Sequence, residues 1–121
     1  MQNLEKMHYE ETIINMTIES WRFTKLFLKI IGKLDPNEAN RYLSQLRYFQ
    51  KSIENNLEQH NLKIINLEGM QYDIGMAATP INIDDFQQND ILFVEQMIEP
   101  LIMGQDGIKK QGTILLAKVE K

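Results

Sequence analysis

A chain of 121 residues is long enough for one domain, or for one helical element and one small β unit, and too short for two full-sized domains. Its 43% hydrophobic and 25% charged residues are ordinary for a globular protein and favour neither a disordered nor a fibrous class. Thirteen basic residues against seventeen acidic ones give a net charge of −4, and no run of Lys and Arg is present. We therefore expect no binding to nucleic acid, because phosphate-tracking surfaces are basic.

Cysteine is absent, which excludes a disulfide framework, thiolate zinc sites and cysteine nucleophiles. Residues 1–6 lack the basic and apolar regions of a secretory signal peptide. No apolar run approaches the roughly 20 residues that span a bilayer. We therefore expect a cytoplasmic protein that does not bind a membrane, and the absence of cysteine is compatible with a reducing compartment.

A long amphipathic helix is predicted from about Leu4 to Leu34, because its apolar residues recur at helical spacing. One line of these residues is spaced by heptads: Met7, Ile14, Trp21 and Leu28. Gly32 is predicted to end the helix, since glycine enters the left-handed conformation without a side-chain clash.

A second helix is predicted to begin at Pro36 and to continue to about Gln59. Asp35 is a favoured capping residue, Pro36 suits the first helical position, and Glu38 follows three residues after the cap. Its apolar residues form one stripe, consisting of Ala39, Tyr42, Leu43, Leu46, Phe49, Ile53 and Leu57. His60 and Asn61 are expected to end this helix, so that the two helices form an antiparallel hairpin.

The remainder of the chain is β-rich and interrupted by turn residues. Strands are predicted at residues 62–67, 91–98 and 113–119, where β-branched and aliphatic residues are concentrated. The connection between the last two strands contains Pro100, Gly104 and Gly107, and we expect a hairpin turn there. The predicted fold class is α+β, with a helical dimerisation region at residues 1–61 followed by a small antiparallel β module at residues 62–121.

Two amphipathic helices bury little apolar surface by themselves, so something must cover what remains exposed. The economical solution is a homodimer in which two hairpins form a four-helix bundle, with Trp21, Leu28, Leu46 and Phe49 at the interface. The alternative is a monomer in which the β module folds back onto the hairpin. The sequence leaves both arrangements open, together with the orientation of the dimer and the order of the strands.

Few residues suit catalysis, and we expect no enzyme activity and no cofactor. The two histidines, His8 and His60, stand near predicted helix ends and are assigned to capping or solvated surface. Asp84, Asp85 and Asp90 lack the spacing of a calcium loop, and turn chemistry explains them, so we expect no metal site. A small hydrolase that uses these aspartates is the third-ranked alternative.

The junction from Leu57 to Asp73 passes from a helix through a short strand to a Gly-x-x-Tyr-Asp motif at Gly69, Tyr72 and Asp73. This junction, the preceding helices and a closing hairpin that ends in residues 113–121 resemble the GrpE family of nucleotide exchange factors for DnaK-type chaperones. The resemblance covers most of the chain after the first helix. It implies a homodimer whose β module binds the ATPase domain of a chaperone and speeds ADP release.

This chain departs from the family pattern within the β module. Ile74 and Ala77 replace the family's Pro and His after the Asp. Glu99-Pro100-Leu101 and Lys109-Lys110-Gln111-Gly112 replace its Gly-Tyr and Arg-Pro-Ala elements. The helical stalk is also short.

The predicted partner-binding residues lie on the strands and turns of this module: Met97, Glu99, Leu101, Met103, Lys109 and Lys110. The functional alternative is a dimeric helical-hairpin adaptor or regulatory protein that binds an unrelated partner through the surface around Met97 to Met103.

Overall fold

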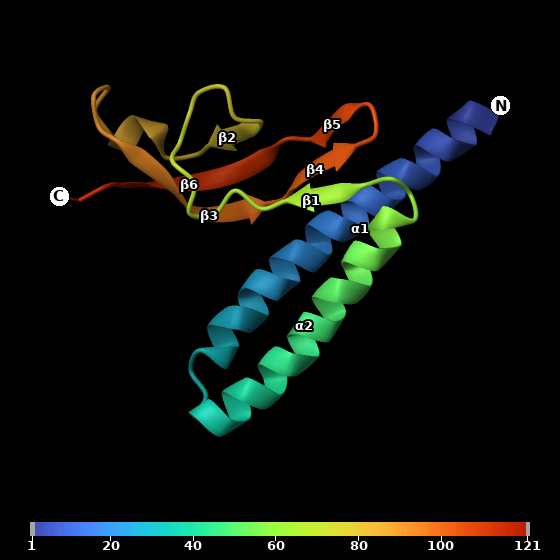
Figure 1. Cartoon of the computed structure of the whole chain (residues 1–121), viewed down its shortest axis with the longest axis horizontal. Helices are drawn as coiled ribbons and strands as arrows, with labels where there is room; N and C mark the ends of the chain where they lie inside the picture. The colour runs from blue at the N-terminus through green and yellow to red at the C-terminus, as the bar shows by residue number, and fades with distance from the viewer. Residues whose placement is uncertain (1, 121) are drawn as a thin grey trace. The chain divides into compact units, whose positions relative to one another are not determined.

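The computed structural model describes residues 2–120, and the side chains of residues 4–120. The chain has an α+β fold and separates into two compact units, Met1–Lys63 and Ile64–Lys121. The first unit is helical and the second contains nearly all of the strands (Figure 1). Each unit is described by itself below.

The helical unit is an antiparallel hairpin of α1 (Gln2–Ile31) and α2 (Pro36–Glu58). Asp35 caps α2 as predicted, since its Oδ1 accepts hydrogen bonds from the backbone N–H groups of Asn37 and Glu38, each at 3.1 Å. These bonds satisfy two of the donors that a helix start leaves without an intrahelical partner.

The two helix ends use different conformations. Gly32 directly follows the end of α1, as predicted, but it does not adopt the positive φ expected for it. The helix ends in tight turns in which Lys33 N–H donates to the Ile30 carbonyl and Leu34 N–H donates to the Ile31 carbonyl. At the end of α2 it is Asn61 that adopts the left-handed conformation, with φ of 58°. Asn tolerates this region better than most residues other than Gly.

The buried residues of α1 are Thr17, Thr24 and Ile31, which lie one heptad apart on one side of the helix. On α2 the buried residues are Leu46 and Leu57. The line of Met7, Ile14, Trp21 and Leu28 lies beside this buried line, and Met7 and Leu28 remain exposed. Two of the three buried positions on α1 are threonines. The periodicity of apolar residues alone therefore indicated the neighbouring line as the buried one.

The β unit contains two three-stranded sheets, ordered β1-β4-β5 and β2-β6-β3. Their strands are β1 (Lys63–Ile65), β2 (Ala78–Pro80), β3 (Leu92–Glu99), β4 (Leu101–Gly104), β5 (Gly107–Lys110) and β6 (Gly112–Lys118). A 3₁₀ turn, η1 (Ile83–Asp85), follows β2. The β3·β6 pair is antiparallel as predicted, whereas β2 pairs with β6 in parallel. The connection in which a hairpin turn was predicted itself forms an antiparallel pair, β4·β5.

The core of the β unit is aliphatic. Val94, Met97, Ile102 and Ile114 are fully buried. Further buried side chains surround them: Leu67, Leu92, Pro100, Leu101 and Leu116. They come from both sheets, so the two sheets share one core.

The segment before β2 covers the free edge of β3. Gly69 N–H donates to the Val94 carbonyl, Val94 N–H donates to the Met70 carbonyl, and Tyr72 N–H donates to the Leu92 carbonyl, each at 2.8 Å. An uncovered edge strand can pair with a strand of another molecule, and these bonds occupy the backbone groups that such pairing would use. Gly69 has φ of +88°, a conformation in which other residues are strained.

Candidate protein interface

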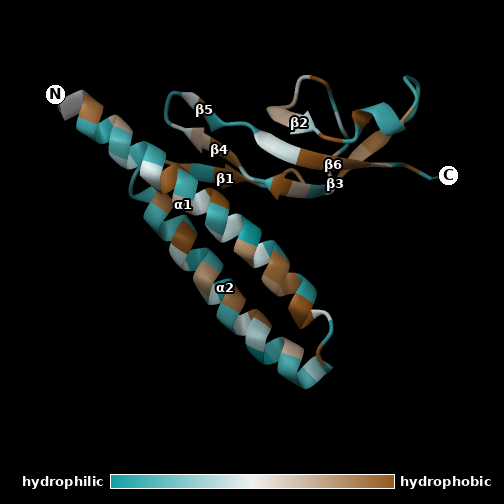
Figure 2. Cartoon of the chain, turned by 180° about the vertical axis from the view of Figure 1, so that it is seen from behind, coloured by the Kyte–Doolittle hydropathy of each residue, from teal (hydrophilic) through white to brown (hydrophobic). Residues whose placement is uncertain are grey.

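The helical hairpin carries an apolar surface that the packing of its own two helices leaves exposed. Tyr9, Met16, Phe23 and Ile30 lie one heptad apart along α1, and they are between 49% and 67% exposed. Hydrophobic residues recur along the whole of α1 in Figure 2. Because heptad spacing keeps residues on one side of a helix, these four form a continuous exposed stripe.

The stripe continues onto α2 through a chain of aromatic contacts. The rings of Phe23 and Phe27 stack with centroids 5.9 Å apart, and Phe27 meets Tyr42 of α2 edge-on at 6.2 Å. Phe49 follows Tyr42 by one heptad and is 37% exposed. We call this surface the hairpin face, and it consists of Tyr9, Met16, Phe23, Phe27, Ile30, Tyr42 and Phe49.

The predicted dimer residues fall on different parts of the hairpin. Phe49 belongs to the hairpin face. Leu46 is only 5% exposed and packs inside the chain, so it offers no surface to a second copy and the predicted contact is corrected. Trp21 is half-buried, with the ammonium of Lys25 4.9 Å above its ring, and Leu28 is 39% exposed on another side of α1.

Two of the predicted partner-binding residues are interior. Met97 is fully buried and Leu101 is 4% exposed, so neither side chain can meet a partner, and their assignment to exposed strands was wrong. Burial does not follow a simple alternation there, because β3 has irregularities between Val94 and Gln96 and between Met97 and Glu99, and Leu101 and Ile102 are both buried. Composition alone therefore does not reveal which side chains face the core. Met103 is half-buried.

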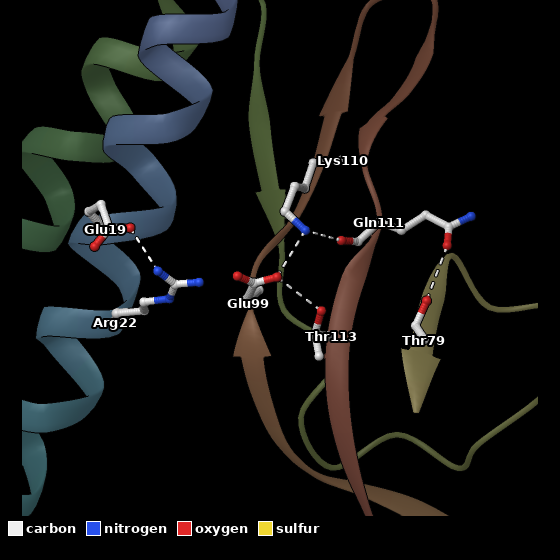
Figure 3. A network of polar contacts seen from close by, with 7 residues as sticks. All are labelled: Glu19, Arg22, Thr79, Glu99, Lys110, Gln111 and Thr113. Carbon is white, nitrogen blue, oxygen red and sulfur yellow. Dashed lines mark hydrogen bonds and ion pairs between the residues drawn. The ribbon is translucent and has the colours of Figure 1, made fainter. Parts of the chain in front are cut away.

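Glu99 and Lys110 form part of a polar network between strands (Figure 3). Lys110 Nζ lies 3.3 Å from Glu99 Oε1 and donates to the Gln111 carbonyl at 2.9 Å. The same Glu99 oxygen accepts a hydrogen bond from the Thr113 hydroxyl at 3.1 Å. These groups therefore join β3, β5 and β6, and their first role is structural.

Lys109 is exposed, and its aliphatic stem lies against Gly104 on the neighbouring strand. A Cβ on Gly104 would come within 2.5 Å of Lys109 Cε. Of the six predicted partner-binding residues, Lys109 alone retains a largely exposed side chain.

The candidate catalytic residues are dispersed. His8 lies on α1, His60 lies just after α2, and Asp84 and Asp85 lie on η1, all exposed. Within residues 2–120, no three His, Asp or Glu side chains gather closely enough to hold a metal ion. Asp90 accepts a hydrogen bond from Gln87 N–H at 2.9 Å and pairs with Lys118 at 3.4 Å. The Gln87 bond, followed by Lys118, lowers the pKa of Asp90 below its ordinary value.

A hollow of about 480 Å³ lies at the open end of the hairpin. It is lined by Glu5, Lys6, Tyr9, Glu10, Gln59, His60 and Asn61. The lining mixes both signs of charge and contains no serine, threonine or cysteine that could act as a nucleophile. The hairpin face is therefore the better-defined functional surface of the helical unit.

Comparison of the chain with protein-family models, with curated proteins and with solved structures finds no match. Among the helices of the described part, none is long and apolar enough to cross a membrane. The class that fold and surface define is a two-unit α+β protein with an exposed hydrophobic hairpin.

Proposed function

We propose that this chain is a homodimeric, non-enzymatic protein that binds other proteins, in the manner of the GrpE family. The observation that carries the proposal is the exposed hairpin face. Seven large apolar side chains on one side of a two-helix hairpin are costly to leave in water, because burial of apolar area stabilises by roughly 25 cal/mol per Å². A second hairpin that packs against this face completes a four-helix bundle.

The exchange-factor reading is supported by the order of the elements and by the junction motif. A long helix, a shorter helix and a compact β unit follow one another, and Gly69 and Tyr72 of the family-like motif secure the edge of β3. In this reading the β unit binds the open form of the ATPase domain of a DnaK-type chaperone more tightly than the closed form. Such a difference in affinity speeds ADP release without any bond-making step.

The decisive experiment measures release of a fluorescent ADP analogue from a DnaK-type chaperone with and without the full chain. Sedimentation equilibrium first determines the oligomeric state. A dimer that accelerates release several-fold supports the exchange-factor proposal. A dimer that neither binds the chaperone nor accelerates release contradicts it, and a monomer contradicts the proposed use of the hairpin face.

The second candidate function is a dimeric adaptor or regulatory protein with an unrelated partner. Met97 and Leu101 are buried, so neither function can use these two side chains as contacts. A chain that is dimeric but does not accelerate ADP release would favour this adaptor.

A further inference from the structure

The β2-β6-β3 sheet has one buried face and one face turned toward solvent. Along β6, Gly112, Ile114 and Leu116 are buried, whereas Thr113, Leu115 and Ala117 are only half-buried. Successive side chains of a strand point to opposite faces. The odd-numbered residues of β6 therefore form the outward face, and Val119, 42% exposed, continues their line.

The neighbouring strands extend this outward face. Phe93 of β3 pairs with Ala117, and Val119 N–H donates to the Ile91 carbonyl at 2.8 Å, which places Ile91 and Phe93 beside the odd-numbered residues of β6. On the other side, Ile81 follows β2, and its N–H donates to the Ile114 carbonyl at 3.0 Å. We call this surface the outer face, and it consists of Ile81, Ile91, Phe93, Leu115, Ala117 and Val119.

The composition of the outer face is unusual for a sheet surface in contact with water. A sheet with one solvated face normally alternates apolar residues with polar ones. At the end of the sheet near Val119 the outward positions are aliphatic or aromatic, and Ile81, Ile91 and Val119 are 59%, 52% and 42% exposed, whereas the outward positions further along, Thr79, Gln96 and Thr113, are polar. Folding of the β unit does not require these side chains to be apolar, because the core lies on the opposite face.

Acidic residues follow residues of the outer face closely along the chain. Asp84 and Asp85 lie on η1 after Ile81, Glu95 lies at the bulge of β3 after Phe93, and Glu120 follows Val119, all exposed. Lys118 is close by, but Asp90 pairs with it at 3.4 Å. A second copy of the chain would bring these carboxylates against one another, and an anionic membrane or nucleic acid would be repelled.

We infer that the outer face is a docking surface for a partner protein whose contact area has an aliphatic centre and a rim of Lys and Arg. The inference rests on the proposed function in assigning partner binding to the β unit, and it moves the contact from the predicted residues Met97 to Lys110 to the outer face. Asn82 holds the acidic turn in place, because its side chain bonds both the N–H and the carbonyl of Leu116 at 2.9 Å.

Site-specific photocrosslinking tests the inference in cells that produce the full chain. A benzophenone side chain replaces Ile91 in one variant and Ile108 in the other. The two isoleucines are 52% and 51% exposed and belong to different parts of the β unit, so they form a matched pair. The expected result is a covalent adduct several-fold more abundant from position 91, in which the crosslinked partner peptide contains aliphatic residues next to Lys or Arg.

Charge reversal provides the second arm. The double change Asp84→Lys and Asp85→Lys is expected to reduce the adduct from position 91 several-fold, whereas Asp106→Lys, in the exposed turn after β4, leaves it unchanged. Equal adducts from positions 91 and 108, an adduct with a second copy of the chain, or no effect of the double reversal would overturn the inference.

The failure of this inference can be told apart from failure of the proposed function. An adduct from position 91 with a protein other than a chaperone, together with no acceleration of ADP release, supports the outer face and contradicts nucleotide exchange. Accelerated ADP release with equal adducts from both positions supports exchange and overturns the outer face.

Discussion

The ammonium of Lys110 lies 3.3 Å from Oε1 of Glu99, and both side chains are about three-quarters buried. This pair joins the last residue of β5 to the last residue of β3, and therefore links the two sheets. The Thr113 hydroxyl completes the contact from β6. This contact between the sheets is expected to contribute to the free energy of unfolding of the β unit.

Glu99→Gln is expected to lower the free energy of unfolding by about 1 kcal/mol, because it leaves the partly buried Lys110 without its counter-charge. Urea denaturation measures the change. The matched control is Glu19→Gln, which breaks the exposed pair with Arg22 on α1 and should cost less than about 0.5 kcal/mol. Equal effects of the two variants would show that the Glu99 pair has no special role.

Asn82→Ala is expected to destabilise the β unit by about 2 kcal/mol, because it leaves the N–H and carbonyl of Leu116 without their side-chain partners. Amide hydrogen exchange at Leu116 should accelerate in parallel. Thr79→Ala is the control, since it removes only one exposed bond of 3.5 Å to Gln111. A loss of stability no larger than that of the control would contradict this role of Asn82.

The stability of the β unit is expected to depend on the ionisation of Asp90. Its pKa is lowered from 3.8 by the Gln87 bond and by Lys118, so the charged form is favoured in the folded state. The stabilisation is fully present above the unfolded pKa and is lost as pH falls through the lower folded pKa. Asp90→Asn should therefore unfold more easily than the natural chain at pH 7, and the difference should shrink below pH 3.8. A difference that does not change with pH would contradict this prediction.

Phe23→Glu is expected to convert the proposed dimer into a monomer, because it places a charge in the centre of the hairpin face. Sedimentation equilibrium measures the change in mass. Tyr48→Glu is the control. Tyr48 is 76% exposed and stands two positions from the buried Leu46, on the opposite side of α2. A dimer that survives Phe23→Glu, or dissociates equally with Tyr48→Glu, would show that the hairpin face is not the interface.

Local sequence signals determined the order and type of most elements. Asp35, Pro36 and Asn61 mark the limits of α2 because capping and left-handed backbone depend on individual residues. The strands β1, β3 and β6 lie where β-branched and aliphatic residues are concentrated. The short strands β2, β4 and β5 were not predicted. β2 forms through its parallel pairing with the distant β6.

Only the tertiary structure decided which apolar residues are buried. Along α1, Thr17 and Thr24 occupy the interior while Phe23 and Ile30 remain exposed, although hydrophobicity alone favours the reverse. In the β unit, Met97 faces the core and Leu115 faces outward, although both lie in apolar runs. Strand register and helix rotation determine which side chain meets the core, and both depend on contacts with segments far away in the sequence.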